Sequence, residues 1–207
     1  TIVGVGATGT VILTAPAAGV PLTVSATGVV IDNVVIQGNI DGTANLLNAT
    51  ANFTVKNVTF NRGVDQLNIA STTVQAFSVD NCTFSVTGNV SNGINSISAN
   101  ASMVQLTVTR STFAVDASGT GIASTSNLTL SVSTFTGSST SPIGVNTSNG
   151  TSTLTNNTFT NLTRALIVSG NTSINATTLN GTIVTATGNT ITGNGATSAS
   201  SSAGAIV

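Results

Sequence analysis

The sequence lacks histidine, glutamate, tryptophan and tyrosine, and only 4% of its 207 residues are charged, compared with about a quarter in an ordinary soluble domain. Without histidine, a serine, threonine or cysteine nucleophile lacks its most common base. Cys82 is the only cysteine, so neither an intrachain disulfide nor a cysteine-histidine zinc site is expected. These absences argue against nucleophilic and metal-dependent catalysis, and we expect no cofactor.

Clustered charge and long apolar runs are also missing. The formal net charge is −1, and the four cations are scattered along the chain, at Lys56, Arg62, Arg110 and Arg164. Nucleic acids and anionic lipids require clustered cations, so neither is an expected partner. No apolar run approaches the length of about 20 residues that a transmembrane helix needs, so we expect no membrane insertion by this segment. The start lacks methionine and a basic leader, and 203–207 reads like a new strand. We therefore expect a processed or partial piece of a longer surface protein.

An eight-residue pattern recurs along the chain and ends in phenylalanine. Clear copies cover 53–60, 77–84, 106–113, 128–135 and 152–159, and weaker copies ending in isoleucine cover 29–36 and 184–191. Copies follow one another at intervals of about 22 to 32 residues, which is the range typical of solenoids. Apolar and polar residues alternate at the start of each copy, as Phe53 and Val55 do with Thr54 and Lys56. This period of two predicts a strand with one buried face.

The second half of each pattern predicts a bend followed by an inward-pointing ring. Asparagine tolerates the left-handed conformation of a tight bend, and Asn57, Asn81 and Asn156 share one position. We expect part of an amide ladder there, interrupted at Arg110 and Val132. The closing phenylalanines are expected to form an internal stack, consisting of Phe60, Phe84, Phe113, Phe135 and Phe159.

Further short apolar segments follow each phenylalanine and predict a second strand per repeat, at 67–69, 94–97, 121–123, 143–145 and 166–168. The sequence therefore predicts an all-β, right-handed parallel β-helix of about eight coils, forming one domain over 1–207. An antiparallel β-sandwich is also rich in threonine and valine. A sandwich, however, does not require one pattern at near-constant spacing, so the repeat favours the solenoid.

The octets, their spacing and the asparagine bend resemble the pectin-lyase-like β-helix superfamily, and 20–38 looks like its early coils. That superfamily contains polysaccharide lyases and hydrolases, phage tailspikes and autotransporter adhesin passengers. Residues 188–194 and 203–206 look like passenger repeats, although Ala203 stands where such repeats often have glycine. The resemblance implies a parallel β-helix, and a shared fold does not define an activity.

The five acidic residues are the candidates for a catalytic site: Asp32, Asp41, Asp65, Asp80 and Asp116. Asp32 and Asp80 share one repeat position two coils apart, which corresponds to roughly 9–10 Å and approaches the separation in inverting glycosidases. Lys56 lies between them, so a surface ion-pair ladder of Asp32, Lys56 and Asp80 is the favoured interpretation. Asp41 and Asp65 are expected in turns. Cys82 shares an inward position with Val58 and Ser111, which predicts a buried, inert thiol.

Outward positions of the first strand predict columns of hydroxyls, formed by Thr107, Thr109, Thr129, Ser131, Thr153, Thr155, Thr185 and Thr187. The simpler interpretation is a solvated strand surface, because threonine suits exposed strands. The alternative is a flat ligand face for a glycan or for ice. Glycosylation sequons also occur, for example at Asn52, Asn57, Asn127, Asn161 and Asn175. The repeat itself places threonine after the asparagine bend, which accounts for many of them.

The sequence favours a non-enzymatic, secreted or cell-surface module with a structural or adhesive role, such as an adhesin passenger in cell adhesion or virulence. Recognition of a glycan or of a protein on a host or neighbouring cell is expected on the threonine and asparagine faces, or on loops such as 85–91 and 114–121. Open solenoid ends favour end-to-end self-association. A polysaccharide lyase, hydrolase or tailspike-like protein and an ice-binding solenoid remain the alternative hypotheses.

Overall fold

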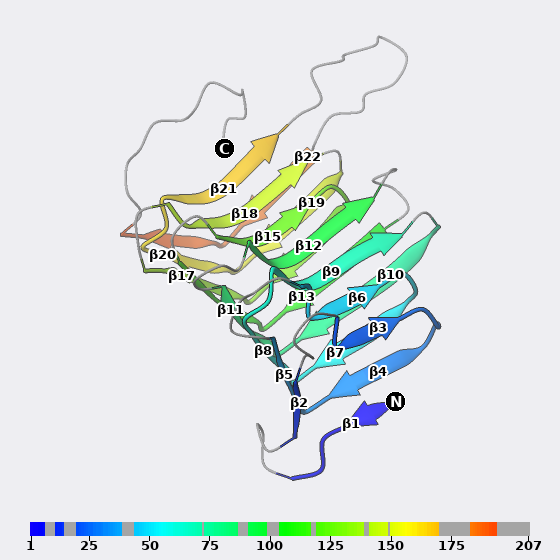
Figure 1. The fold of residues 1–207 in the computed structure, drawn as a ribbon. Coiled ribbons are helices and arrows are strands. Elements are labelled where there is room, and N and C mark those ends of the chain that lie inside the picture. Colours follow the sequence, from blue (N-terminus) through cyan, green and yellow to red (C-terminus); the bar gives the residue numbers. More distant parts are fainter. Residues whose placement is uncertain are drawn as a thin grey trace.

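The computed structural model describes residues 1–6, 11–14, 20–38, 44–71, 73–86, 91–98, 104–116, 119–138, 141–148, 150–169 and 183–193. The chain winds through these residues as a parallel β-solenoid with three sheets (Figure 1). The described residues contain strands and turns but no helix. The predicted all-β solenoid is therefore confirmed. Asp41, Asn175 and 203–207 lie outside the described residues.

Successive coils place their equivalent strands side by side. The first sheet contains β1 (Ile2–Val3), β4 (Val29–Asp32), β7 (Phe53–Lys56), β10 (Gln75–Asp80), β13 (Val104–Thr109), β16 (Asn127–Ser131), β19 (Thr151–Thr155) and β22 (Ile183–Thr187). The second sheet contains β2 (Ile12–Thr14), β5 (Val35–Gln37), β8 (Thr59–Asn61), β11 (Thr83–Val86), β14 (Thr112–Val115), β17 (Thr134–Gly137), β20 (Thr158–Thr160) and β23 (Thr190–Thr192). The third sheet contains β3 (Leu22–Val24), β6 (Leu47–Ala49), β9 (Asp65–Ser71), β12 (Asn92–Ser98), β15 (Thr120–Ser124), β18 (Ile143–Ser148) and β21 (Arg164–Ser169).

Strand pairing is parallel in all three sheets, and its register aligns the repeats. Phe53 pairs with Phe77 in the first sheet, and Phe60 pairs with Phe84 in the second. The same alignment continues to the last coil of the second sheet, where Phe159 pairs with Ile191. Parallel pairing excludes the antiparallel sandwich for these residues, and it places equivalent side chains of successive coils directly beside one another.

The bend between the first and second sheets has a positive φ in every coil from Asn33 onward. The φ values are 57° at Asn33, 54° at Asn57, 51° at Asn81, 49° at Arg110, 53° at Val132, 55° at Asn156 and 65° at Gly188. The side-chain Nδ2 of Asn81 donates to Asn57 Oδ1 over 2.8 Å, which confirms this part of the predicted ladder. Arg110 and Val132 interrupt the amides but keep the same backbone, because the neighbouring coils impose it.

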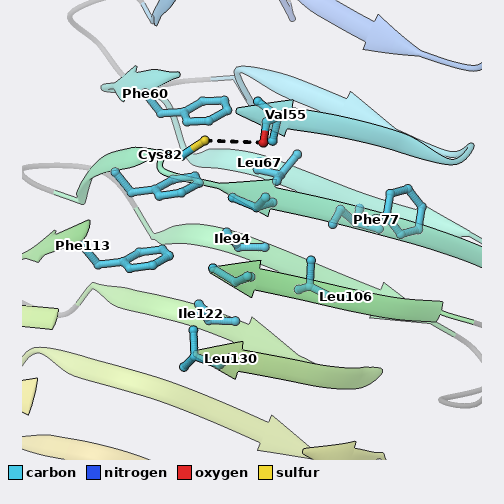
Figure 2. Packing of buried hydrophobic residues seen from close by; sticks show 14 of the residues in the cluster. Val55, Phe60, Leu67, Phe77, Cys82, Ile94, Leu106, Phe113, Ile122 and Leu130 are labelled. Atoms are coloured by element: carbon cyan, nitrogen blue, oxygen red, sulfur yellow. Dashed lines mark hydrogen bonds between the residues drawn. The ribbon is translucent and has the colours of Figure 1, made fainter. Parts of the chain in front are cut away.

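Five phenyl rings form one stack against the second sheet. Neighbouring ring centroids are 4.5–4.9 Å apart, and the ring planes are inclined by 2–14°, along the series Phe60, Phe84, Phe113, Phe135 and Phe159. Leu67, Ile94 and Ile122 form a parallel column on the third sheet and fill the core beside the rings (Figure 2). The predicted internal stack of phenylalanines is thus present.

Glycines on the third sheet make room for these rings. Gly93, Gly121 and Gly144 occupy one column. A Cβ atom on Gly121 would lie 2.7 Å from Phe135 Cε1, and one on Gly144 would lie 2.9 Å from Phe159 Cδ1. The column changes to Ala165 one coil later, where Ile191 replaces the ring in the second sheet. The rings of Phe113, Phe135 and Phe159 are therefore accompanied by a column of glycines, whereas one coil earlier the same column contains the buried Gln66.

A column of polar side chains is buried just after the bend. Ser111 Oγ accepts from the Cys82 amide over 3.2 Å, and Ser133 Oγ accepts from the Ser111 amide over 3.1 Å. Asn157 Oδ1 then accepts from the Ser133 amide over 2.9 Å. Each of these three coils therefore supplies a side-chain acceptor for a backbone donor of the preceding coil, which offsets the cost of burying both groups.

Two predictions about connecting segments were wrong. Asp65 does not lie in a turn but begins β9 with its side chain buried. The segments expected to be loops are partly strand, since Ser85 and Val86 belong to β11 and 114–115 to β14. Residues 120–121 belong to β15, whereas 87–90 and 117–118 lie outside the described residues. Coil stacking extends the strands because each added residue gains two ladder hydrogen bonds.

Candidate functional site

Asp32 is held by two neighbours from the next coil. Asn57 Nδ2 donates to Asp32 Oδ1 over 2.8 Å, and Lys56 Nζ lies 3.2 Å from Oδ2. The hydrogen bond from Asn57, followed by that from Lys56, lowers the pKa of Asp32, and partial desolvation opposes this shift. Lys56 and Asp32 face each other in the parallel register of β4 and β7, so their contact follows directly from the coil alignment.

Asp80 pairs with Arg110, not with Lys56, so the predicted ladder of Asp32, Lys56 and Asp80 is wrong at its third member. Arg110 Nε donates to Asp80 Oδ1 over 2.9 Å, and Nη2 contacts Oδ2. Thr109 Oγ1 donates to the same Oδ1 over 2.7 Å. The guanidinium can engage both carboxylate oxygens in a planar fork, which a lysine ammonium cannot match. The Arg110 hydrogen bond is the main cause that lowers the pKa of Asp80.

The two carboxylates do not have the properties of a glycosidase acid and base. Asp32 and Asp80 both align with Lys56, one coil on either side of it. A general acid at neutral pH requires a carboxyl whose pKa is raised, usually by an apolar environment. The pKa of each carboxyl is instead lowered, so both are ionised at neutral pH. Their geometry fits two local ion pairs on a β surface.

Asp65 lies in an asparagine ladder on the third sheet that was not predicted from the sequence. Asn92 Nδ2 donates to Asp65 Oδ1 over 2.7 Å, and Asn95 Nδ2 donates to Oδ2 over 2.9 Å. Asn68 Nδ2 in turn donates to Asn48 Oδ1 over 3.1 Å. Aligning the second strands residue by residue, as was done for the octets, would have shown that Asn48, Asn68 and Asn95 share one column.

The remaining acids and the thiol provide no metal site within the described part of the chain. Ser138 Oγ donates to Asp116 Oδ1 over 3.0 Å. Across the described ranges there is no group of three or more cysteine and aspartate side chains that could hold a metal ion. Coordination of calcium or magnesium needs several converging oxygens, whereas each described aspartate is bound to its own neighbours.

Cys82 is buried, as predicted, in the column that contains Val58 and Ser111. Its Sγ lies 3.7 Å from the Val55 carbonyl oxygen (Figure 2) and 3.3 Å from that of Asp80. Desolvation by burial raises the pKa of this thiol to about 12, and the nearby carboxylates act in the same direction. The thiol therefore stays protonated at neutral pH and is a poor nucleophile.

The predicted hydroxyl columns of the first sheet are in register. Thr107, Thr129, Thr153 and Thr185 form one column, and Thr109, Ser131, Thr155 and Thr187 form the other. Thr107, Thr129, Thr185 and Thr187 are exposed, and the other four are half-buried. The second column continues through Asp80, Lys56 and Asp32, so the charged residues share this face. Ligand binding by these columns stays a prediction.

A longer threonine column on the second sheet was not predicted. It consists of Thr59, Thr83, Thr112, Thr134, Thr158 and Thr190, paired in register through successive strands. The signal was present in the sequence, because a threonine precedes the closing phenylalanine or isoleucine in each of these repeats. The hydroxyl columns predicted above comprise only outward positions of the first strand.

Every aromatic side chain of the protein is inside the solenoid. The chain contains seven phenylalanines and neither tyrosine nor tryptophan, and all seven are at most 3% exposed. A ligand therefore meets hydroxyls, amides and methyl groups and finds no aromatic ring on which to stack.

The fold defines the chain as a parallel β-solenoid. In comparisons with known proteins, no family model, no curated protein and no solved structure matches it. A search of the described residues for a helix long and apolar enough to cross a membrane found none.

Proposed function

We propose that this chain is a non-enzymatic structural and adhesive module of a secreted or cell-surface protein. The observation that carries the proposal is the continuous parallel register of the three sheets. Stacked rings, buried polar ladders and strand hydrogen bonds connect each coil to the next. Such a solenoid forms a stiff rod whose faces repeat with every coil, which suits a spacer that holds a binding surface away from a cell.

The state of the acidic residues supports a role without catalysis. Asp32 and Asp80 are ion-paired and have lowered pKa values. Cys82 is buried and protonated. The resemblance to adhesin passengers also supports an adhesive role. We expect the partner to be a glycan or a protein on a neighbouring or host cell. A glycan would be bound through hydroxyls and amides, because the aromatic rings are buried.

The experiment compares binding of the labelled chain to cells, to extracellular matrix and to a glycan array. The test variant Thr107→Lys/Thr129→Lys places charge on exposed positions of the first sheet. The control Thr23→Lys changes an exposed threonine of β3 in the third sheet. We expect the double variant to reduce binding severalfold and the control to bind like the parent. Equal binding by all three proteins would remove this face from the interaction, and no binding by the parent would contradict an adhesive role.

An assay for polysaccharide cleavage tests the competing enzyme hypothesis. The intact chain is incubated with polyuronates and cell-wall glycans, and new reducing ends and unsaturated products are measured. We expect neither product. Cleavage that disappears in Asp32→Asn or Asp80→Asn would identify a catalytic acid and overturn the proposal.

A further inference from the structure

The outer face of the second sheet differs from the other two faces because the outward positions within its described strands carry no charged side chain. Asp116, which directly follows β14, lies at the edge of this face and accepts a hydrogen bond from Ser138. One outward column contains Ile12, Val35, Thr59, Thr83, Thr112, Thr134, Thr158 and Thr190. The other contains Thr14, Gln37, Asn61, Ser85, Ala114, Thr136, Thr160 and Thr192. The first sheet, in contrast, exposes Lys56 beside Asp32, and the third sheet exposes Arg164.

Threonine occupies both columns on the last three coils. The pairs are Thr134 with Thr136, Thr158 with Thr160, and Thr190 with Thr192. Among the threonines of both columns from β8 onward, five are exposed: Thr83, Thr112, Thr136, Thr190 and Thr192. The other four are half-buried: Thr59, Thr134, Thr158 and Thr160. Between described residues, the outer threonines of this sheet make one side-chain hydrogen bond, between Thr160 Oγ1 and Thr192 Oγ1 at 3.3 Å. The hydroxyls of the exposed residues Thr83, Thr112, Thr136 and Thr190 are therefore available to a ligand.

The core fixes the spacing of this face in two directions. Along the solenoid, the phenyl rings behind these threonines repeat at 4.5–4.9 Å. Across the solenoid, residues i and i+2 of one strand are separated by about 6.6 Å. Five stacked rings make the interior rigid, so the threonines are held in position before any ligand arrives.

We propose that the outer face of the second sheet binds ice. The inference rests on the proposed function, in which the β faces and not a catalytic centre are the working surface, and it names the partner of one face. Oxygen atoms on the prism planes of hexagonal ice repeat in two perpendicular directions, at separations comparable to the 4.5–4.9 Å between coils and the roughly 6.6 Å along a strand. An uncharged lattice of water is matched by an uncharged rank of hydroxyl donors and acceptors, and the threonine methyl groups order the water between them.

Other occupants fit this face less well. A protein partner usually buries aromatic or arginine anchors at the centre of the interface, and this face presents neither of them. A soluble glycan bound through hydroxyls and amides would be better surrounded in a concave site, whereas these columns lie on a regular strand surface. A rigid repeating face is best complemented by a partner that repeats at the same spacing.

The test measures thermal hysteresis of the intact chain and the binding of its fluorescent form to a single ice crystal. Thr112→Tyr on β14 introduces a side chain that holds the face away from a flat surface. Thr23→Tyr on β3 is the control, because it makes the same change at an exposed threonine of the third sheet. We expect hysteresis from the parent and the control, and a severalfold loss for Thr112→Tyr. Thr112→Lys and Thr23→Lys form a second pair that adds charge on a flexible side chain, in case the tyrosine variant fails to fold.

Three outcomes would overturn the inference. The first is a parent chain without hysteresis or ice binding. The second is equal hysteresis for the Thr112 variants and the parent. The third is a loss for Thr107→Tyr on the first sheet with none for the folded Thr112 variants, which would place the ice-binding face elsewhere. If the first outcome is accompanied by binding to crystalline cellulose or chitin, the ice inference is overturned and the adhesive function stays intact. A chain that binds neither ice nor cells, matrix or glycans would contradict both proposals.

Discussion

The phenyl rings of Phe113 and Phe135 lie face to face, with centroids 4.5 Å apart and planes inclined by 2°. The separation is close to the spacing of strands in a parallel sheet, about 4.8 Å. The distance between neighbouring rings therefore matches the rise from one coil to the next. A substitution at one ring is expected to affect the rings above and below it.

Phe113→Ala is expected to destabilise the fold by about 3–5 kcal/mol, because a fully buried ring in the middle of the stack is replaced by a cavity. Phe113→Leu fills much of the space and should cost less. Urea unfolding followed by circular dichroism measures both free energies. Loss below about 1 kcal/mol for the alanine variant would show that the ring stack contributes little to coil stability.

Gly121→Ala is expected to destabilise the fold by about 1–3 kcal/mol through overpacking against a ring. An added Cβ would lie 2.7 Å from Phe135 Cε1 and 2.7 Å from the Gly144 carbonyl oxygen. Phe135→Leu removes the first contact, so the two substitutions together should cost less than the sum of their separate effects. A double-mutant cycle by urea unfolding measures this coupling, and strictly additive effects would contradict it.

Val132 is a β-branched residue held at a φ of 53° at the corner between β16 and β17. Its side chain is 59% exposed, so little packing is lost on replacement. Val132→Asn should stabilise the fold by about 1 kcal/mol, because asparagine tolerates the left-handed conformation. Thr129→Asn in the extended part of β16 is the control and should give no gain. A lower melting temperature for Val132→Asn would contradict the expected relief of strain.

Alkaline unfolding should depend on Cys82. Burial raises the pKa of the folded thiol to about 12, whereas an unfolded thiol titrates near pH 8.5. Since the unfolded chain loses this proton first, stability should fall from about pH 8.5 upward until the folded thiol also titrates. Cys82→Ser should remove this dependence and be tolerated, because Ser111 and Ser133 occupy the same column. The measurement is the urea midpoint of both proteins between pH 7 and 11. An unchanged pH dependence in the serine variant would rule out the thiol as its cause.

Acid unfolding should depend on Asp32 and Asp80. The pKa of each is lowered in the folded state, so their stabilising effect is present above the unfolded value of about 4. It is lost as the pH falls through the folded values. The chain has no histidine or glutamate, so stability should be nearly constant between about pH 5 and pH 8. Asp80→Asn should cost less than about 1 kcal/mol at neutral pH, because the pair with Arg110 is solvent-exposed. Thermal melts of the parent and of Asp80→Asn across pH 2–8 test the pH dependence and the cost of the substitution. A steep change near pH 6.5 would contradict the constant stability expected between pH 5 and pH 8.

The fold could be predicted because one pattern is repeated along the chain. The octets that end at Phe60, Phe84, Phe113, Phe135 and Phe159 differ in detail but keep the same alternation and bend. Once strands stack in parallel, a register shift of one residue would turn every inward side chain outward. The burial of these rings therefore selects one alignment, and the columns of the first sheet follow from it.

The candidate faces were less predictable. The second-sheet threonines at Thr83, Thr112 and Thr134 stand inside the octets, but their significance as one uncharged face depends on what surrounds them. Asp65 was expected in a turn, although it begins a strand with its carboxylate buried and bound by two asparagines of the next coil. Local sequence defines the type of each residue and does not define which neighbours the adjacent coil provides.

The sequence by itself determined the parallel solenoid, the inward column of rings and the asparagine bend, because period and spacing act through the backbone and through apolar burial. Only the tertiary structure decided that Asp80 binds Arg110 and leaves Lys56 to Asp32, and that the strands of the second sheet present an outer surface without charge. The physical reason is one of range. Burial restricts a side chain to one of two faces, whereas a polar partner is selected by distances of a few ångströms between atoms of different coils.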